Sequence, residues 1–379
     1  MRAITSDLTI PMKALRIYAG PAARRHIAQN GLQPADVGVV PGAAGGPKGL
    51  ILGPLDRFLF GQWLPRSQQA IDLVGGSIGA WRMATACLDD CVSAFERLER
   101  DYIQQQYELP PGRKRPTAQQ VSAQFGENLR LFFDGRIDEV LHHPRYRLHV
   151  VTARGRHVLA REGAARTPLG YLGAFAANTL HRRALGGWLE RVVFSSPEPE
   201  GHGRPGALPF ATQDFRSRQV LLEACNFKPA LQASCSIPFV LQAVHDIPGA
   251  PAGAYWDGGI TDYHLHLDYR SRSPGTGGAG LVLYPHFQRS VVPGWLDKGL
   301  RWRHRATPFL DTTVVLAPDP EWVATLPNGK LPDRTDFTRY GMDWRARAKA
   351  WGTAVAQAQQ LPDELAEWLE RGQGAVEPL

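Results

Sequence analysis

The sequence predicts an α/β fold with a mostly parallel central sheet. Short apolar runs that are typical of buried strands alternate along the chain with longer helix-like segments, an order that favours a parallel sheet covered on both faces. Two of these runs lead through glycine-rich turns into helices, at residues 37–53 and 70–90. The 379 residues are 43% hydrophobic, enough for a sizeable core, and no run of about 18 apolar residues predicts a membrane-spanning helix.

Each element follows from the local pattern. Apolar runs predict strands. A further strand is expected at 254–257, where it leads into a loop. The runs lie at residues 15–19, 37–40, 70–76, 146–154, 191–196, 280–287 and 312–320. Periodic segments predict helices at residues 22–29, from 47, from 78, at 102–135 with a basic Pro/Gly loop at 109–117 between two helical parts, in patches over 161–190, at 217–238 and at 334–371. We expect one domain over residues 1–379, with its core at about 36–318 and a helical C-terminal extension at about 332–372.

Composition limits the classes of partner and the compartment. The net charge of +7 favours anionic partners in general, but no helix-turn-helix, zinc-finger or RNA-binding signature is present, so we expect no nucleic-acid partner. Four cysteines do not suggest a disulfide framework, and no zinc-type spacing accompanies them, so we expect no metal. The N-terminus lacks the apolar stretch of a secretory signal. These features predict a cytoplasmic protein.

The stretch Gly75-Gly76-Ser77-Ile78-Gly79 fits the nucleophile-elbow pattern G-x-S-x-G. In that pattern a sharp strand-to-helix turn exposes the serine hydroxyl to substrate. The apolar run before Ser77 and the helical pattern after it supply the required context. Chance and ordinary turns produce many such matches, so Ser77 needs a base and oxyanion donors elsewhere in the chain.

The glycine loop at residues 42–49 precedes another helix-like segment. A phosphate loop would need glycine in place of Pro47 and serine or threonine in place of Gly49. An oxyanion hole fits better, with the N–H groups of Gly45 and Gly46 facing the charge that develops on a carbonyl oxygen. A plain turn at the start of a helix is the remaining alternative.

Asp257-Gly258-Gly259 ends the strand predicted near residue 254. Asp-Gly pairs are common in tight turns, so this stretch alone predicts only a turn. In combination with the other two motifs, Asp257 becomes the candidate base for Ser77.

In this order the motifs resemble those of the patatin-like phospholipase family. The matching pieces are Gly45-Gly46-Pro47-Lys48-Gly49, the Ser77 elbow flanked by Gly75 and Gly79, Asp257-Gly258-Gly259, and the stretch 233–240. The resemblance covers about residues 36–265. It implies a three-layer α/β/α fold, a Ser–Asp dyad that needs no histidine or cofactor, and lipid acyl hydrolase activity. Ala44 and the stretch 260–266 depart from the family pattern, which leaves the substrate open.

The mechanism that we expect is acyl transfer to Ser77, with Asp257 as general base and Gly45 and Gly46 as oxyanion donors. Lys48 would anchor the loop or meet an anionic head group. Burial would have to make the Asp257 carboxylate more basic. The substrate could be a phospholipid, a lysolipid, a thioester or a polyester.

Two other functions fit the same sequence. An α/β-hydrolase with a Ser–Asp–His triad could draw its histidine from four positions after Asp257, namely His264, His266, His286 and His304. A lipid- or protein-binding module without turnover is the other alternative.

The stretch 295–309 mixes tryptophan and phenylalanine with lysine and arginine. Such a mixture suits contact with an anionic membrane surface, and it also suits a solvated helix with one packed face.

Overall fold

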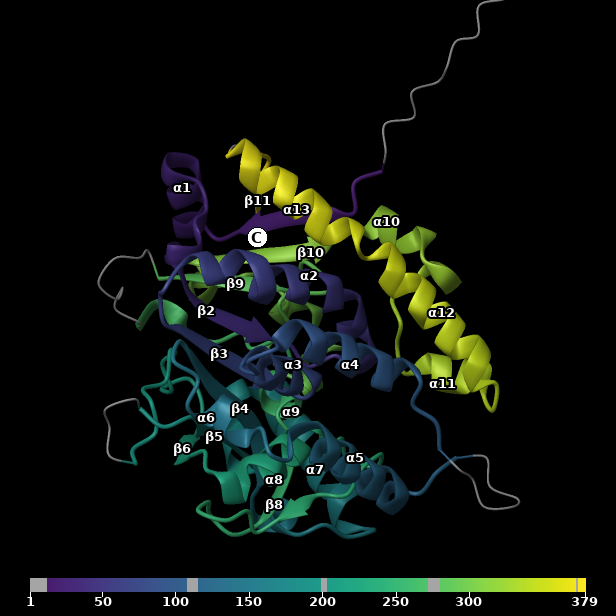
Figure 1. Cartoon of the computed structure of the whole chain (residues 1–379). Helices are drawn as coiled ribbons and strands as arrows, with labels where there is room; N and C mark the ends of the chain where they lie inside the picture. The colour runs from purple at the N-terminus through teal and green to yellow at the C-terminus, as the bar shows by residue number, and fades with distance from the viewer. Residues whose placement is uncertain (1–11, 108–114, 199–202, 272–279, 373) are drawn as a thin grey trace, which may run out of the picture.

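The computed structural model describes residues 12–107, 115–198, 203–271, 280–372 and 374–379 (Figure 1). The stretch on which the absence of a secretory signal was predicted begins in the first 11 residues, which lie outside the described part. Within the described part, no helix is long and apolar enough to cross a bilayer.

The strands and helices alternate along most of the chain, as an α/β fold requires. The strands are β1 (Leu15–Ala19), β2 (Val37–Gly42), β3 (Ile71–Gly76), β4 (Tyr146–Gly155), β5 (Leu189–Ser195), β6 (Ser217–Leu221), β7 (Val244–His245), β8 (Ala254–Asp257), β9 (Leu281–Pro285), β10 (Thr313–Pro318) and β11 (Glu377–Pro378). The α-helices are α1 (Pro21–Asn30), α2 (Gly53–Phe58), α3 (Ile78–Ala86), α4 (Cys91–Ile103), α5 (Ala118–Phe133), α6 (Ile137–Leu141), α7 (Arg166–Leu180), α8 (Ala224–Cys235), α9 (Gly259–Asp262), α10 (Pro320–Thr325), α11 (Thr335–Tyr340), α12 (Trp344–Gln357) and α13 (Gln360–Arg371).

The described strands form one 11-stranded sheet whose main path has the order β11-β1-β10-β9-β2-β3-β4-β5-β6, with β7 and β8 attached beside β4. The central run from β10 to β4 is parallel throughout. Antiparallel pairs join β1 to β10 and β4 to β5 and β8. The protein is therefore an α/β protein with a mostly parallel central sheet, as the sequence predicts.

Both faces of this sheet are buried, which explains why its strands are apolar runs without polar alternation. Val40 and Leu73 point into the main core, under the helices that include α2 and α3. Their neighbours Val39 and Val74 point into a second cluster on the other face, built with irregular segments around Leu265. The sheet thus holds the loop ends of β2 and β3 in fixed positions.

The helix that the sequence predicts from residue 217 is replaced by a strand over its first five residues. Residues 217–221 form β6, which pairs in parallel with β5, and the helix α8 begins only at Ala224. The prediction of helix from residue 217 was wrong because the stretch forms the edge strand of the sheet, where most of its residues are only partly buried. Backbone pairing with β5 decides the structure, and single-sequence periodicity does not show that pairing.

The C-terminal helices pack back onto the part of the chain that carries the glycine loop. In Figure 1, α13 runs beside α2, with α10 near its start, and α12 continues toward α11. Contacts join α13 to α2 and β1, and α12 to α4 and to the 3₁₀ helix Gly46–Leu52 that follows the glycine loop. The sheet also includes β1 and β11, which lie outside the stretch 36–318 that was expected to hold the core. The segment after residue 330 therefore reaches the site that the motifs define.

Candidate active site

Ser77 lies at a strained turn between β3 and α3. Its backbone has φ 55° and ψ −132°, a region that residues with a side chain rarely adopt. Strain of this kind costs about 1–3 kcal/mol and persists only where the surrounding structure imposes it. β3 and α3 are almost completely buried and supply that constraint. This is the geometry of a nucleophile elbow.

The hydroxyl of Ser77 donates a hydrogen bond to Asp257, with 2.7 Å between Oγ and Oδ2. The sheet brings the two residues together, because Gly76 pairs with Val151 and Asp257 pairs with Thr152, the next residue of β4. The end of β3 and the end of β8 therefore meet across one strand. The second carboxylate oxygen of Asp257 accepts a 2.7 Å hydrogen bond from the N–H of Gly259. Both residues are nearly closed to solvent, Ser77 at 3% and Asp257 at 5% exposure.

The end of α8 ties the serine and the carboxylate to one backbone segment. Ser234 Oγ accepts a hydrogen bond from the N–H of Ser77 at 2.9 Å and donates one to the carbonyl of Val151 at 2.7 Å. The carbonyl of Ser236 accepts the N–H of Asp257 at 3.0 Å. The stretch 233–240, which the sequence singles out by resemblance alone, thus has a physical role in fixing the distance between Ser77 and Asp257.

Burial raises the pKa of Asp257 above its ordinary value of 3.8, because a buried carboxylate loses its hydration. The hydrogen bond from Ser77, the charge of Arg334, the N–H of Gly259 and the charge of Lys298 each oppose this rise. The net direction is upward, so the carboxylate is a better base than an exposed aspartate.

The raised pKa of Asp257 gives a prediction for the pH dependence of ester hydrolysis. A general base must be unprotonated, so kcat/KM should fall as the pH drops through the pKa of Asp257. Because that pKa is raised, the fall should begin at a higher pH than for an ordinary aspartate. The pH profile of kcat/KM for a neutral ester measures this directly. A profile that stays flat down to pH of about 4 would contradict the assignment of Asp257 as the base.

The glycine loop leaves two backbone N–H groups free beside this pair. Among the described residues, the N–H groups of Gly45 and Gly46 have no hydrogen-bond partner, whereas that of Ala44 bonds the carbonyl of Tyr263 at 2.9 Å. Gly46 has a φ of 57°, which only glycine adopts freely. A side chain on Gly45 would lie 2.5 Å from the ring of Phe287. The loop therefore requires both glycines and can offer two donors to an oxyanion.

The remaining motif glycines allow close packing around the elbow. A Cβ atom on Gly79 would lie 1.9 Å from the carbonyl oxygen of Gly42, and one on Gly75 would lie 2.3 Å from the Cα of Ala80. A Cβ on Gly258 would lie 2.0 Å from the carbonyl oxygen of Val151.

Two further motif glycines differ in how closely they are packed. A Cβ on Gly259 would meet Ala44 at 2.6 Å, so this glycine lets the Asp257 turn approach the glycine loop. A Cβ on Gly49 would lie 3.4 Å from Ile78, which is ordinary contact. Gly49 therefore packs the loop against the start of α3 without being sterically required there.

The four candidate histidines bond to other groups. His264 and His266 each face backbone carbonyls, of Ser290 and Val291. His286 bonds within its own loop, to Gln288, and His304 faces the carbonyl of Asp297. Burial lowers the pKa of His266 to about 4 and that of His286 to about 3. None of these contacts joins a histidine to Ser77 or Asp257 within the described part of the chain.

Sequence reasoning missed Lys298 and Arg334, although both lie beside the dyad. Both act electrostatically on Asp257, and Arg334 Nε lies 3.2 Å from the position that a Cβ on Gly46 would take. Neither belongs to a motif, and Arg334 is more than 70 residues beyond Asp257. Only the return of the C-terminal helices toward the glycine loop brings Arg334 to the site.

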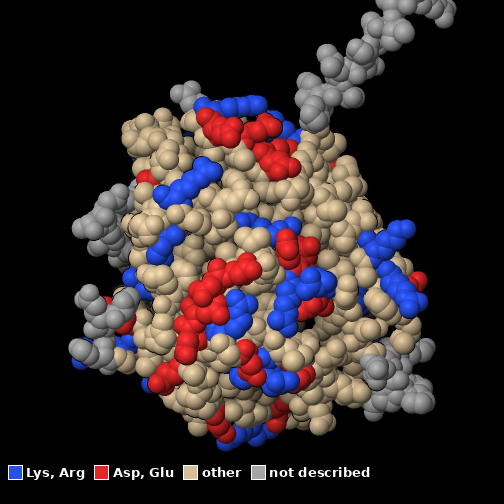
Figure 2. Space-filling model, in the orientation of Figure 1, with Lys and Arg blue, Asp and Glu red and all other residues tan. Residues whose placement is uncertain are grey.

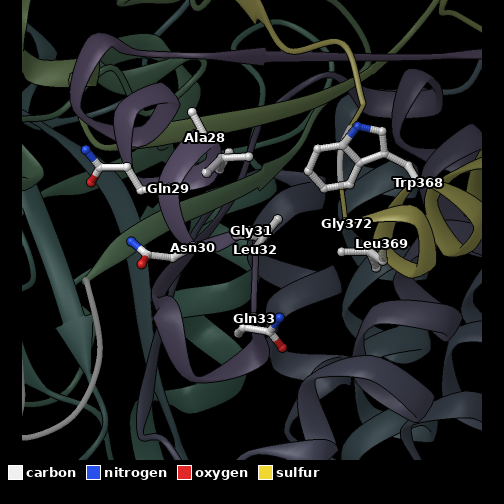
Figure 3. Close-up of a pocket in the computed structure, with 10 residues that line it drawn as sticks. Ala28, Gln29, Asn30, Gly31, Leu32, Gln33, Trp368, Leu369 and Gly372 are labelled. Carbon is white, nitrogen blue, oxygen red and sulfur yellow. The ribbon is translucent and has the colours of Figure 1, made fainter.

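The surface offers other concave regions away from this site. Figure 3 shows a pocket of 260 Å³ between the end of α1 and α13, lined by Gln29, Asn30, Gln33, Trp368 and their neighbours. No motif residue lines it. On the face in Figure 2, acidic and basic side chains are interspersed, so the net positive charge forms no single basic stripe there. The described residues include no group of three or more His, Cys, Asp or Glu side chains that could hold a metal ion.

Comparisons with protein-family models, curated proteins and solved structures found no match to this chain.

Proposed function

We propose that the protein is a serine hydrolase that cleaves carboxylic ester bonds of lipids through a Ser77–Asp257 dyad. The 2.7 Å hydrogen bond between the two side chains, at a strained strand-to-helix turn, is the observation on which the proposal depends. The two free N–H groups of the glycine loop and the resemblance of the motifs to those of patatin-like phospholipases support it. We propose the three-layer α/β/α architecture of that family for the fold.

In this mechanism Ser77 Oγ attacks the ester carbonyl carbon while Asp257 accepts the serine proton. The N–H groups of Gly45 and Gly46 stabilise the oxyanion, each worth about 100- to 1000-fold in rate. Collapse of the intermediate expels the alcohol, which takes the proton from Asp257. Water then attacks the acyl-enzyme with Asp257 as base, the carboxylic acid leaves, and Ser77 recovers its proton.

A fluorophosphonate probe tests this proposal, because it reacts covalently with activated serine hydroxyls. We expect the probe to label the wild-type protein and not the Ser77→Ala variant. If the probe still labels the Ser77→Ala variant, the assignment of the nucleophile is wrong. If the folded wild type shows neither labelling nor hydrolysis, the result favours a binding module. Retained hydrolysis in alanine variants of all four histidines, made one at a time, would remove the triad alternative.

We also propose peripheral contact with an anionic membrane surface by a cytoplasmic form of the protein. The cysteines are all free, which suits a reducing compartment. The outward face of α7 is apolar, with Leu172 at 65% and Leu180 at 86% exposure, and exposed apolar faces of this kind mark interaction sites. Trp302 is 62% exposed, and its neighbour Arg303 bonds the carbonyl of Thr179 near the end of α7.

The stretch 295–309 contributes less to this surface than the sequence suggests. It forms three short 3₁₀ turns, not a helix with two faces. Trp295 and Phe309 are half-buried against the core, so Trp302 is the exposed aromatic residue of the stretch. Exposed arginines border the apolar patch at positions 166, 183, 301 and 305 and would complement anionic lipid.

Sedimentation with lipid vesicles tests the membrane contact. We expect binding to vesicles that contain anionic lipid and weaker binding to zwitterionic vesicles. Leu172→Gln should reduce the bound fraction several-fold, since each lost apolar contact is worth about 1.5–3 kcal/mol when fully buried. Met342→Gln is the matched control, because Met342 is exposed outside the patch. Equal binding by the wild type and Leu172→Gln would contradict the proposal.

A further inference from the structure

Three cations from three separate segments lie near the candidate catalytic pair or near the glycine loop beside it. Lys48 belongs to the 3₁₀ helix after the glycine loop, and its Nζ lies 5.3 Å from the centre of the Phe287 ring. Lys298 Nζ lies 4.0 Å from the centre of the Tyr263 ring. Arg334 precedes α11 and lies against Gly46. The rings that two of these cations contact also flank the glycine loop and the Asp257 turn.

Within the described part of the chain, none of the three cations has a carboxylate within the 4.0 Å of a salt bridge. Some buried cations elsewhere in the described chain are paired with carboxylates, whereas the buried Arg347 bonds the backbone carbonyl of Gln105. Arg82 bonds Asp56 through two 2.7 Å contacts, and Arg191 bonds Asp262 at 2.6 Å. Three cations without a salt bridge to a described residue therefore lie at the candidate active site, with Lys48 partly buried and Lys298 and Arg334 exposed.

The three charges also act on one another. The pKa of Lys298 is lowered to about 8, chiefly by burial and then by repulsion from Arg334 and Lys48. Burial lowers the pKa of Lys48 as well. Asp257 attracts Lys298 and Asp333 attracts Lys48, but the like charges still repel one another, and a bound anion would reduce that repulsion. Arginine binds phosphate and carboxylate through paired hydrogen bonds, while lysine acts as a point charge.

We propose that Lys48, Lys298 and Arg334 bind an anionic group, a phosphate or a carboxylate, that the ester substrate carries close to its scissile carbonyl. This inference rests on the proposed esterase function, which makes an ester the substrate. The chemistry of the cluster suits either anion, on the acyl or on the alcohol side of the ester. Lys298 lies in the stretch 295–309 and Arg334 just before α11, both outside the motifs that carry the resemblance, so the resemblance does not predict this specificity.

Matched pairs of esters test the proposal. On the acyl side, 4-nitrophenyl butyrate is compared with mono-4-nitrophenyl succinate, which has a carboxylate at the end of a chain of similar length. On the alcohol side, 1-butyrylglycerol is compared with 1-butyrylglycerol 3-phosphate. We expect the wild type to prefer the anionic member of at least one pair by about tenfold or more in kcat/KM, as a charge-assisted contact allows. The preferred pair identifies the source of the anion.

The variants Lys298→Gln and Arg334→Gln should each lower that preference by about tenfold. Arg339→Gln is the control, because Arg339 is an exposed arginine on α11, the helix that directly follows Arg334. A wild type without preference for either anionic ester would overturn the proposal. Variants that lower kcat/KM equally for the neutral and the anionic ester would also overturn it. In that case the cations would act on the dyad and not on the substrate.

Binding of inorganic phosphate keeps this test separate from catalysis. At constant ionic strength, phosphate in place of chloride should raise the unfolding temperature of the wild type and of Ser77→Ala, and should raise it less in Arg334→Gln. If fluorophosphonate labelling and hydrolysis both fail while phosphate still stabilises Ser77→Ala, the esterase function is wrong and the anion site stands. If phosphate stabilises none of the proteins, the anion site is wrong whatever the activity.

Discussion

Replacement of Ser77 by alanine should lower kcat/KM for an ester by about 10⁴- to 10⁶-fold, because it removes the atom that becomes acylated. Asp257→Asn should lower it by about 10²- to 10⁴-fold, the usual contribution of a general base. Asparagine keeps an oxygen that can accept the N–H of Gly259, but it cannot take a proton from Ser77. Initial rates on 4-nitrophenyl butyrate measure both effects.

The double variant separates a dyad from two independent residues. If Ser77 and Asp257 act as a unit, Ser77→Ala with Asp257→Asn should be no slower than Ser77→Ala alone. Ser93→Ala and Asp101→Asn are matched controls, since both residues are exposed on α4 and neither bonds Ser77 or Asp257. Thermal unfolding of each variant checks that the fold is retained. More than about a hundredth of the wild-type rate in Ser77→Ala would exclude Ser77 as the nucleophile.

The sequence predicts those parts of the site that depend on local backbone geometry. A serine between glycines at the end of an apolar run predicts the turn that Ser77 adopts, because few other sequences tolerate a φ of 55° after a buried strand. The alternation of runs likewise predicts a parallel sheet. Parallel strands then place the loops that follow β2 and β3 at the same edge.

The parts of the site that depend on long-range packing are not predictable from local pattern. Ser234 links the N–H of Ser77 to β4 across more than 150 residues, and nothing in its own neighbourhood indicates that role. Arg334 reaches Gly46 only because α12 packs on the 3₁₀ helix after the glycine loop. The edge strand β6 was mistaken for helix for the same reason, since its partner β5 decides its structure.

Gly79→Ala should strongly destabilise the protein. The added methyl group would lie 1.9 Å from the carbonyl oxygen of Gly42 and 2.2 Å from its carbon, and both atoms belong to β2, which is paired on both sides in the middle of the sheet. Backbone in that position cannot move without breaking sheet hydrogen bonds. We expect a loss of about 3 kcal/mol in the free energy of unfolding, at the upper end for overpacked sites, with loss of activity as α3 shifts.

Urea unfolding of Gly79→Ala and Gly352→Ala compares a glycine required by close packing with one that is not. A methyl group on Gly352, within α12, would meet no atom within 4 Å, so alanine should stabilise the protein by about 0.5–1 kcal/mol through helix propensity. The two substitutions are chemically identical and should shift the midpoint in opposite directions. Equal midpoints for Gly79→Ala and the wild type would mean that β2 and α3 do not approach this closely, and the elbow that positions Ser77 would then lack its support.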